Sequence, residues 1–198
     1  MKKLLFSTLI LGFFTFGTQI CEAKNYYFKF NDKESKMGFY LETSLHSVNG
    51  EVRKFKGNIN IKTVDDNTIK DADGLLEVNA DSLFTNQNQR DAKMKNEILS
   101  VANFPLIKFK INSAKIMSNK IAEDNMLYLR LIGNLTIRDV TKNIEVPVKI
   151  KLAPDKSSAV VEGKYTVSFP DYNVPDPSLP IIGKVDPNIN ISFTIKAY

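Results

Sequence analysis

The chain has 198 residues, of which 43% are hydrophobic and 25% charged, and its formal net charge at pH 7 is +5. This is the composition of a globular protein long enough for one core, and the mild basic excess gives no indication of nucleic-acid binding. The single cysteine, Cys21, excludes a disulfide within the chain, and the single histidine, His46, excludes a metal site built from several histidines.

The first 23 residues have the pattern of a secretory signal peptide. Lys2 and Lys3 precede an apolar run, Leu4 to Phe16, followed by a more polar end. The run is shorter than the roughly 20 residues that a membrane-spanning helix needs. We therefore expect cleavage after Ala23 and a periplasmic or secreted mature protein of one domain, residues 24–198. The alternative is a lipoprotein anchored to a membrane through Cys21.

After the signal, short segments alternate between apolar and polar residues. Their apolar positions are Met37, Phe39 and Leu41; Ile59 and Ile61; Leu76 and Val78; Leu127, Leu129, Leu131, Leu135 and Ile137; Ile144, Val146, Val148 and Ile150; Val161, Tyr165, Val167 and Phe169; and Ile189, Ile191, Phe193 and Ile195. Such alternation is typical of antiparallel sheets with one covered face.

Polar residues between these segments predict turns. We expect turns at residues 65–67, 71–74, 118–119 and 154–156. Pro147 lacks a backbone N–H, so its strand is expected to lie at a sheet edge or to contain an irregularity.

At residues 90–104 the strand pattern stops and becomes helical. Met94 and Ile98 lie four residues apart with Leu99 beside them, which predicts a short helix with one apolar side. Pro105 prevents the helix from continuing. We expect this helix to lie against an apolar surface and to close one end or side of a sheet.

The helix is an insertion between strands. Asn86 or Asn88 is expected to cap its start. Beyond the proline, Ile107, Phe109 and Ile111 alternate with polar residues, so another strand follows.

The last irregular segment, residues 170–187, contains five prolines and is too apolar for a free linker, with Leu179, Ile181 and Ile182. We expect it to pack across the mouth of a barrel or to join the last two strands. About nine strands with one short helix must cover their own apolar face, which leaves a sandwich or a closed barrel. A barrel of about eight strands is either filled by side chains or holds one small ligand.

Four stretches follow one another in the order found in a known family: SLHSVNGEVRKFKGNI, RDAKMKNEILSVANFPLIKF, LIGNLTIRDVTKNIEVPVKI and GKYTVSFPDYNVPDPSLPIIGKVDPNINISFTIKA. Together they resemble the YceI-like family of bacterial extracytoplasmic lipid-binding proteins. Asp139 departs from the glycine usual there, and the segment between Phe39 and Gly50 is one residue shorter than the common form. The resemblance implies an all-β fold with one short helix, an antiparallel lipocalin-like barrel of about eight strands enclosing an apolar pocket for an isoprenoid chain.

The residues that could carry chemistry form no catalytic constellation. His46 has no cysteine partner in the mature chain and no visible relay, so we interpret it as an ordinary, partly exposed histidine. The acidic residues at 65–73 lack the spacing of a calcium loop. Arg90 and Asp91 have two interpretations: a helix-start ion pair, or an Arg90 donor fork for a phosphate at the barrel mouth.

We therefore expect a protein that is not an enzyme and that binds, transports or stores an amphiphilic isoprenoid-type lipid in the bacterial envelope. Candidate ligands are a polyisoprenoid, a quinone and a fatty acid derivative, with no metal, cofactor or nucleic acid as partner. A homodimer and weak contact with a membrane surface remain open. The alternatives are a structural or adhesive envelope domain with a filled core, and a hydrolase that uses His46. The residues hypothesised to bind the ligand are Phe39, Leu41, Ile59, Val78, Arg90, Met94, Phe109, Ile111, Leu129, Leu131, Val146, Val148, Tyr165, Val167 and Phe193.

Overall fold

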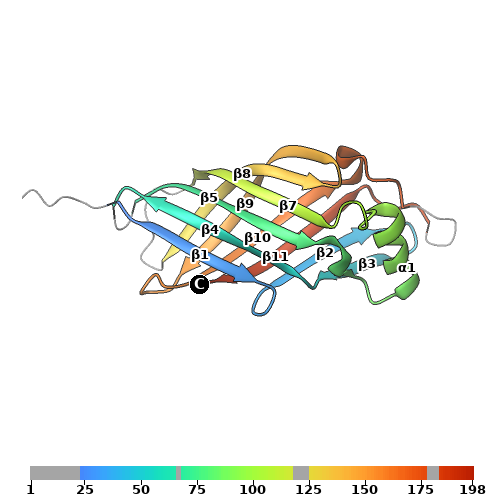
Figure 1. Cartoon of the computed structure of the whole chain (residues 1–198), viewed down its shortest axis with the longest axis horizontal. Coiled ribbons are helices and arrows are strands. Elements are labelled where there is room, and N and C mark those ends of the chain that lie inside the picture. The colour runs from blue at the N-terminus through green and yellow to red at the C-terminus, as the bar shows by residue number, and fades with distance from the viewer. Residues whose placement is uncertain (1–22, 66–67, 118–124, 178–182) are drawn as a thin grey trace, which may run out of the picture.

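The computed structural model describes residues 23–65, 68–117, 125–177 and 183–198. Within these ranges eleven strands form one antiparallel sheet that closes on itself (Figure 1). The strands are β1 (Asn25–Asn31), β2 (Lys36–Glu42), β3 (Ser47–Val52), β4 (Phe55–Thr63), β5 (Ile69–Asn79), β6 (Leu83–Phe84), β7 (Leu106–Ile116), β8 (Met126–Ile137), β9 (Val140–Leu152), β10 (Ala159–Ser168) and β11 (Asn188–Ala197). The predicted signal peptide lies outside the described residues except for Ala23.

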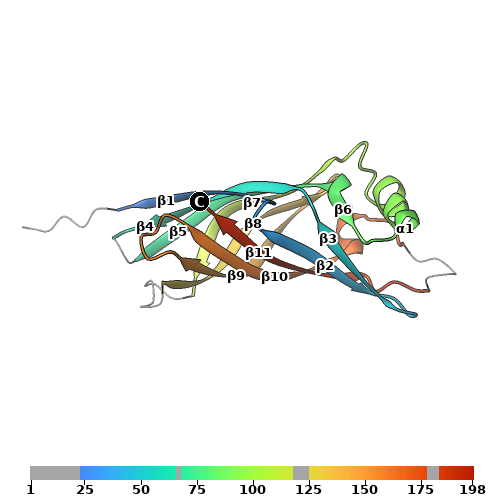
Figure 2. The same ribbon diagram turned by 90° about the horizontal axis from the view of Figure 1, so that it is seen from below.

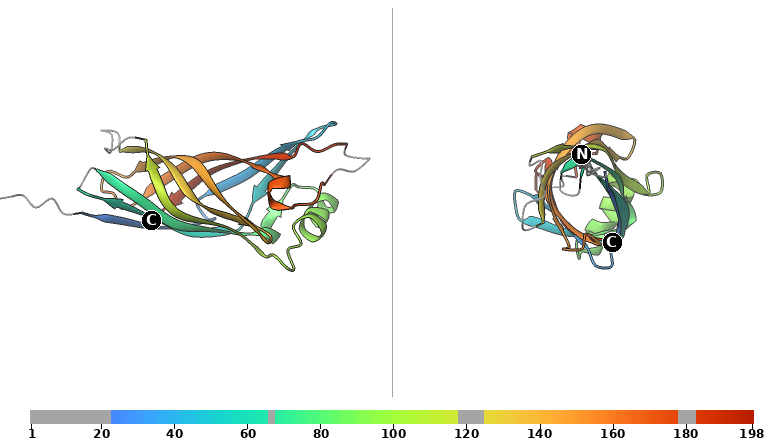
Figure 3. Two further views of the ribbon diagram at one scale, coloured as in Figure 1. Left: turned by 90° about the horizontal axis from the view of Figure 1, so that it is seen from above. Right: turned by 90° about the vertical axis from the view of Figure 1, so that its left-hand side faces the viewer.

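The eleven strands make an eight-stranded barrel, because three positions in the ring are each filled by two successive strands. Strands β1 and β2 both run antiparallel to β11. Strands β4 and β3 pair with β1 and β2, and β5 and β6 pair with β4 and β3. Seen from one end, the strands form a closed ring (Figure 3). This confirms the predicted antiparallel barrel of about eight strands with one short helix.

The three interrupted strands break at neighbouring positions in the barrel wall. The backbone N–H of Asp32 donates to the carbonyl of Phe55 at 3.1 Å, and that of Asn79 donates to the carbonyl of Lys54 at 3.0 Å. A short 3-10 helix, Ala80–Ser82, makes the third break. Strands β2, β3 and β6 therefore belong to one end of the barrel, the end that carries the helix (Figure 2).

The opposite half of the barrel is filled by side chains. The apolar face of each strand points inward, as the alternation predicts, and forms a single core cluster. Its largest fully buried side chains are Ile61, Leu127, Leu129, Ile150 and Leu152. Leu127 and Ile150 are paired on the adjacent strands β8 and β9 and are both fully buried, so they belong to one inward-facing layer of the core.

The predicted helix begins at Asn88 and has two parts, α1 (Asn88–Lys93) and a π-helical turn η2 (Met94–Ile98). Gln87 caps it by accepting a hydrogen bond from the N–H of Arg90, so the expected caps Asn86 and Asn88 are wrong. The described part of the chain contains no helix of the length and apolarity that crossing a membrane requires.

The turn expected at residues 71–74 is also wrong, since these residues continue strand β5. One carboxylate oxygen of Asp71 accepts from the N–H groups of Ala72 and Ala114, both at 2.8 Å. It thereby bonds across the irregularity where the pairing of β7 with β8 shifts register between Ile111 and Ser113. Asp73 forms an ion pair with Lys62 on the neighbouring strand. Side-chain pairing thus keeps a turn-like sequence extended.

Other expected breaks are found. Pairing between β9 and β10 stops at Val148, next to Pro147, which confirms the predicted irregularity. Residues 154–156 form a turn in which Lys156 has a φ of 57°. Phe169, expected at the end of a strand, instead begins a 3-10 helix, η3 (Phe169–Tyr172). Residues 66–67 and 118–119 lie outside the described ranges.

Candidate functional site

An apolar cavity of ≈ 210 Å³ lies inside the helical end of the barrel, and its wall is almost entirely apolar. Neighbouring strands contribute alternate residues to the wall, because every second side chain of a strand points inward. Examples are Phe39 and Leu41 on β2, and Leu135 and Ile137 on β8. Gly50, opposite Phe39 on β3, leaves room for the phenyl ring, since a Cβ there would lie 2.0 Å from the ring.

The helical segment covers one side of this cavity. Met94, Ile98 and Leu99 all line it, which confirms the prediction that the apolar side of the helix lies against an apolar surface. The π-turn closes with a hydrogen bond of 2.9 Å from the N–H of Leu99 to the carbonyl of Met94.

The segment between β10 and β11 covers another side. Val174 and Pro177 line the cavity before the gap in the described residues, and Val185 lines it after the gap. The prediction that this segment packs across the mouth is confirmed for its described ends. Leu179, Ile181 and Ile182, on which that prediction rested, lie outside the described residues.

Arg138 connects these two covers. Its Nη1 donates to the carbonyls of Ile98, at the end of the helix, and of Asn173, just after η3, at 3.2 and 3.3 Å. The guanidinium also lies 5.5 Å from the ring centroid of Phe104. One side chain at the start of the β8–β9 turn therefore holds both covers in place over the cavity.

The only nitrogen-bearing side chains in the described lining of the cavity belong to His46, Arg90 and Lys93, and no carboxylate lines it. Because the wall is apolar, we infer that Arg90 and Lys93, both half-buried, line it with their aliphatic stems and hold their charges at the rim. Within the described residues, the ammonium of Lys93 and the ring of His46 make no hydrogen bond or ion pair. Arg90 and Lys93 therefore make the rim cationic, while the wall of the cavity is apolar.

Arg90 is held in place by Thr85, the residue that follows strand β6. Its Nε donates to Thr85 Oγ1 at 2.7 Å, and its Nη2 donates to the Thr85 carbonyl at 2.8 Å. Asp91, which is buried, accepts from the N–H of Thr85 at 2.9 Å. Arg90 and Asp91 are therefore linked through Thr85, and one edge of the guanidinium is left for other partners.

The structure places the fifteen hypothesised ligand-binding residues in two groups. Six of them line the cavity: Phe39, Leu41, Val78, Arg90, Met94 and Val167.

The other nine lie outside the cavity lining, in the inward face of the filled part of the barrel or packed against it: Ile59, Phe109, Ile111, Leu129, Leu131, Val146, Val148, Tyr165 and Phe193. They share one interior with the first group, as the alternation predicts, but not one cavity, because other side chains fill the space around them. Leu129, for example, is 1% exposed.

Several residues that line the cavity were not among the hypothesised residues: Thr85, Lys93, Ile98, Ile107, Leu135, Ile137, Ile189 and Ile191. Most belong to the same alternating series. Ile107 precedes Phe109 by two positions, and Ile191 precedes Phe193 by two. Their positions near the end of each strand that lies at the helical end of the barrel would have identified them.

Tyr172, on η3, is 2% exposed, and its hydroxyl has no hydrogen-bond partner among the described residues. Burial, followed by the nearby Tyr165 and Asp171, raises the pKa of Tyr172 to about 12. The hydroxyl therefore stays neutral at any physiological pH. Tyr172 acts as an apolar ring in the core beside the cavity.

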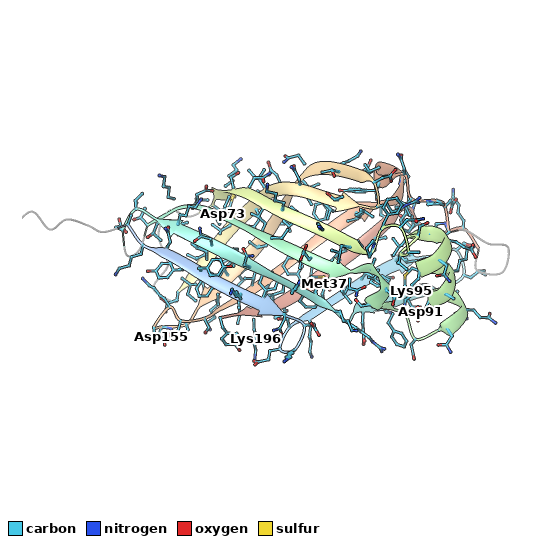
Figure 4. All side chains as sticks on the ribbon, viewed as in Figure 1. Met37, Asp73, Asp91, Lys95, Asp155 and Lys196 are labelled. Atoms are coloured by element: carbon cyan, nitrogen blue, oxygen red, sulfur yellow. The ribbon has the colours of Figure 1, made fainter. Side chains whose placement is uncertain are left out.

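No group of three or more His, Cys, Asp or Glu side chains within the described ranges is placed to hold a metal ion. His46 lies in the exposed connection between β2 and β3, at the cavity mouth. Asp91 and Lys95 are on the helical segment, and Asp155 is at the opposite end of the barrel (Figure 4).

The profile of the YceI-like domain family matches residues 28–197 of this chain. No curated protein matches it.

Solved structures share the fold at low sequence identity. The crystal structure of Burkholderia cenocepacia BcnA is similar with a TM-score of 0.69 at 14% identity, covering 85% of this chain and 99% of that one. A polyisoprenoid binding domain from Saccharophagus degradans, implicated in plant cell wall breakdown, has a TM-score of 0.68 at 12% identity, covering 88% and 98%. The Campylobacter jejuni YceI protein has a TM-score of 0.52 at 15% identity, covering 99% and 97%.

Proposed function

This chain belongs to the YceI-like family, and we propose that it binds an amphiphilic isoprenoid-type lipid and carries or stores it in the bacterial cell envelope without chemical change. The observation that carries this proposal is the apolar cavity under the helix, closed by two covers and walled almost entirely by hydrocarbon. A similar barrel, from Saccharophagus degradans, is a polyisoprenoid binding domain.

Burial of the lipid tail supplies the driving force. Each methylene moved from water to an apolar wall contributes about 0.8 kcal/mol, so a chain of several isoprene units binds tightly without any polar contact. The cavity wall offers this environment at Leu41, Ile137 and Ile189.

The rim suits the polar end of the same ligand. Lys93 and the free edge of Arg90 present cationic donors where the cavity opens, and the lining described here contains no carboxylate to repel an anion. A phosphate or carboxylate head would gain charge-assisted hydrogen bonds there, and a neutral quinone head would gain ordinary ones. Among the candidate ligands, this arrangement favours an amphiphile with an acidic head over a hydrocarbon alone.

The alternatives have less support. A purely structural domain would require a filled interior at the helical end, where the cavity lies. A hydrolase would require partners for His46, and its ring makes no hydrogen bond to any described residue. A His46→Gln variant is expected to keep lipid uptake within a few-fold of the parent.

Export to the envelope is part of the proposal and rests on the first 23 residues. Weak contact with an anionic membrane surface, and a homodimer, are compatible with it.

Mass spectrometry of an organic extract from natively purified protein tests the binding function. The expected result is a co-purified amphiphilic lipid with an isoprenoid or acyl tail. Absence of any lipid, together with no uptake of added isoprenoids, would favour the structural alternative.

A further inference from the structure

We propose that an aromatic floor halfway along the barrel, built by Phe55 and Phe109 with Tyr165 across from them, limits the length of the lipid tail. This inference rests on the proposed function and specifies which members of the ligand class the pocket accepts. It follows from where the lining of the cavity ends on each strand.

The cavity reaches only partway along the barrel. On β2 and the residue that follows it, the lining runs from Thr43 at the mouth to Met37. At about 3.3 Å per residue and a strand tilt of about 40°, this span is about 15 Å along the barrel axis. Strand β9 has 13 residues, so the barrel itself is about twice as deep. Met37 lies midway between the helical end and the end that carries Asp155 (Figure 4).

Two phenylalanines lie where the lining stops. Phe109 pairs directly with Leu135, which lines the cavity, and Phe55 pairs with Val78, which also lines it. Paired residues of antiparallel strands project from the same face, so both rings point into the barrel. Phe55 is 3% exposed and Phe109 is 7% exposed, and both belong to the core cluster.

The opposite wall contributes Tyr165, which pairs with the lining residue Ile191 and packs against the same cluster. In the ring order, β10 lies across the barrel from β4 and β7. Below this level lie the fully buried Leu127, Leu129 and Ile150. A tail that reaches the aromatic level therefore meets a close-packed core.

Packing of this kind selects by length. Each methylene of the tail that contacts the apolar wall increases the binding affinity about fourfold. Isoprene units that would extend beyond the aromatic floor add no affinity or must fold back within the cavity. The ligand class is thus short-chain prenyl or acyl amphiphiles, with longer chains held only in part.

The test uses prenyl alcohols of increasing length, from geraniol through farnesol and geranylgeraniol to solanesol, in competition with one fluorescent fatty acid. For the parent protein, affinity should rise with length and then level off. In Phe109→Ala the limit should move to a longer alcohol, with an affinity gain of about tenfold or more for the first alcohol beyond the parental limit. If Phe109→Ala does not fold, Phe109→Leu should give the same shift with a smaller gain.

Phe28→Ala is the matched control. Phe28 is 2% exposed in the same core cluster and pairs with Ile59 in the filled half, so its removal opens space that does not join the cavity. It should keep the parental limit. The aromatic floor would be contradicted if the affinity of the parent rose by a constant factor per added unit up to solanesol. It would also be contradicted if Phe28→Ala shifted the length at which affinity levels off as Phe109→Ala does. Binding of none of the alcohols would overturn the proposed function instead.

Discussion

A single carboxylate oxygen of Asp91 accepts hydrogen bonds from both the backbone N–H and the hydroxyl of Thr85, at 2.9 and 2.5 Å. Both residues are buried, and Thr85 also accepts two bonds from Arg90. This arrangement fixes the start of the helix to the rim of the barrel, and with it one cover of the cavity.

Asp91→Ala should therefore destabilise the protein by about 1 to 3 kcal/mol, because it leaves the buried N–H of Thr85 without a partner. Denaturant unfolding measures the change. Asp139→Ala, in an exposed turn, serves as the control and should stay within about 0.5 kcal/mol of the parent. A parental midpoint for Asp91→Ala would mean that this contact does not hold the helix.

Tryptophan substitutions distinguish the filled half from the open half. Leu129→Trp overpacks a close-packed layer and should cost about 1 to 3 kcal/mol of stability, while lipid binding by the folded fraction persists. Val167→Trp places the same ring beside the cavity and should reduce lipid binding with a smaller loss of stability. The chain has no tryptophan of its own, so the fluorescence of Trp at 167 also reports the ligand directly. If Leu129→Trp and Val167→Trp reduced lipid binding equally, the division of the barrel into a filled half and a half with a cavity would be contradicted.

The buried hydroxyl of Tyr172 gives a pH-dependent prediction. Its pKa in the folded protein, about 12, is above the usual value of 10, so the unfolded chain loses the proton first as pH rises. The free energy of unfolding should therefore fall between pH 10 and 12. Tyr172→Phe should have parental or higher stability at pH 8, and its free energy of unfolding should fall less than the parent's above pH 10. Urea unfolding at pH 8 and above pH 10 measures both effects. A loss above about 1 kcal/mol at pH 8 would indicate a partner for the hydroxyl.

The family resemblance was needed to choose a closed barrel over a sandwich. Alternation along the chain was sufficient to predict antiparallel strands with one covered face, because period-two patterns report directly which face of a strand is covered. It failed at residues 71–74, whose composition is typical of a turn. There Asp71 bonds to a backbone N–H on β7 and Asp73 pairs with Lys62, and these partners are distant in sequence. Local propensity does not include such contacts.

The candidate site was predictable as an interior but not as a cavity. Phe109 and Ile107 have the same pattern and the same inward direction, yet only Ile107 lines the cavity. The difference depends on how side chains from several strands fill the cross-section at each level, which no single segment encodes. The helix prediction was more informative, since Met94 and Ile98 mark the open end.

The N-terminus of the mature protein tests the export proposal. Intact-mass analysis of the protein purified from its native envelope fraction should give a chain that begins at Lys24. An acylated Cys21 at the N-terminus would instead place the same barrel on a membrane.

Methyl-resolved NMR during titration with farnesol measures most directly whether the lipid tail occupies the helical half of the barrel. We expect shifts for the methyl groups of Leu41, Ile137 and Val167, which line the cavity, and none for Leu127 and Ile150 in the filled half. Equal shifts in both halves, or saturating binding without shifts at the cavity residues, would contradict it.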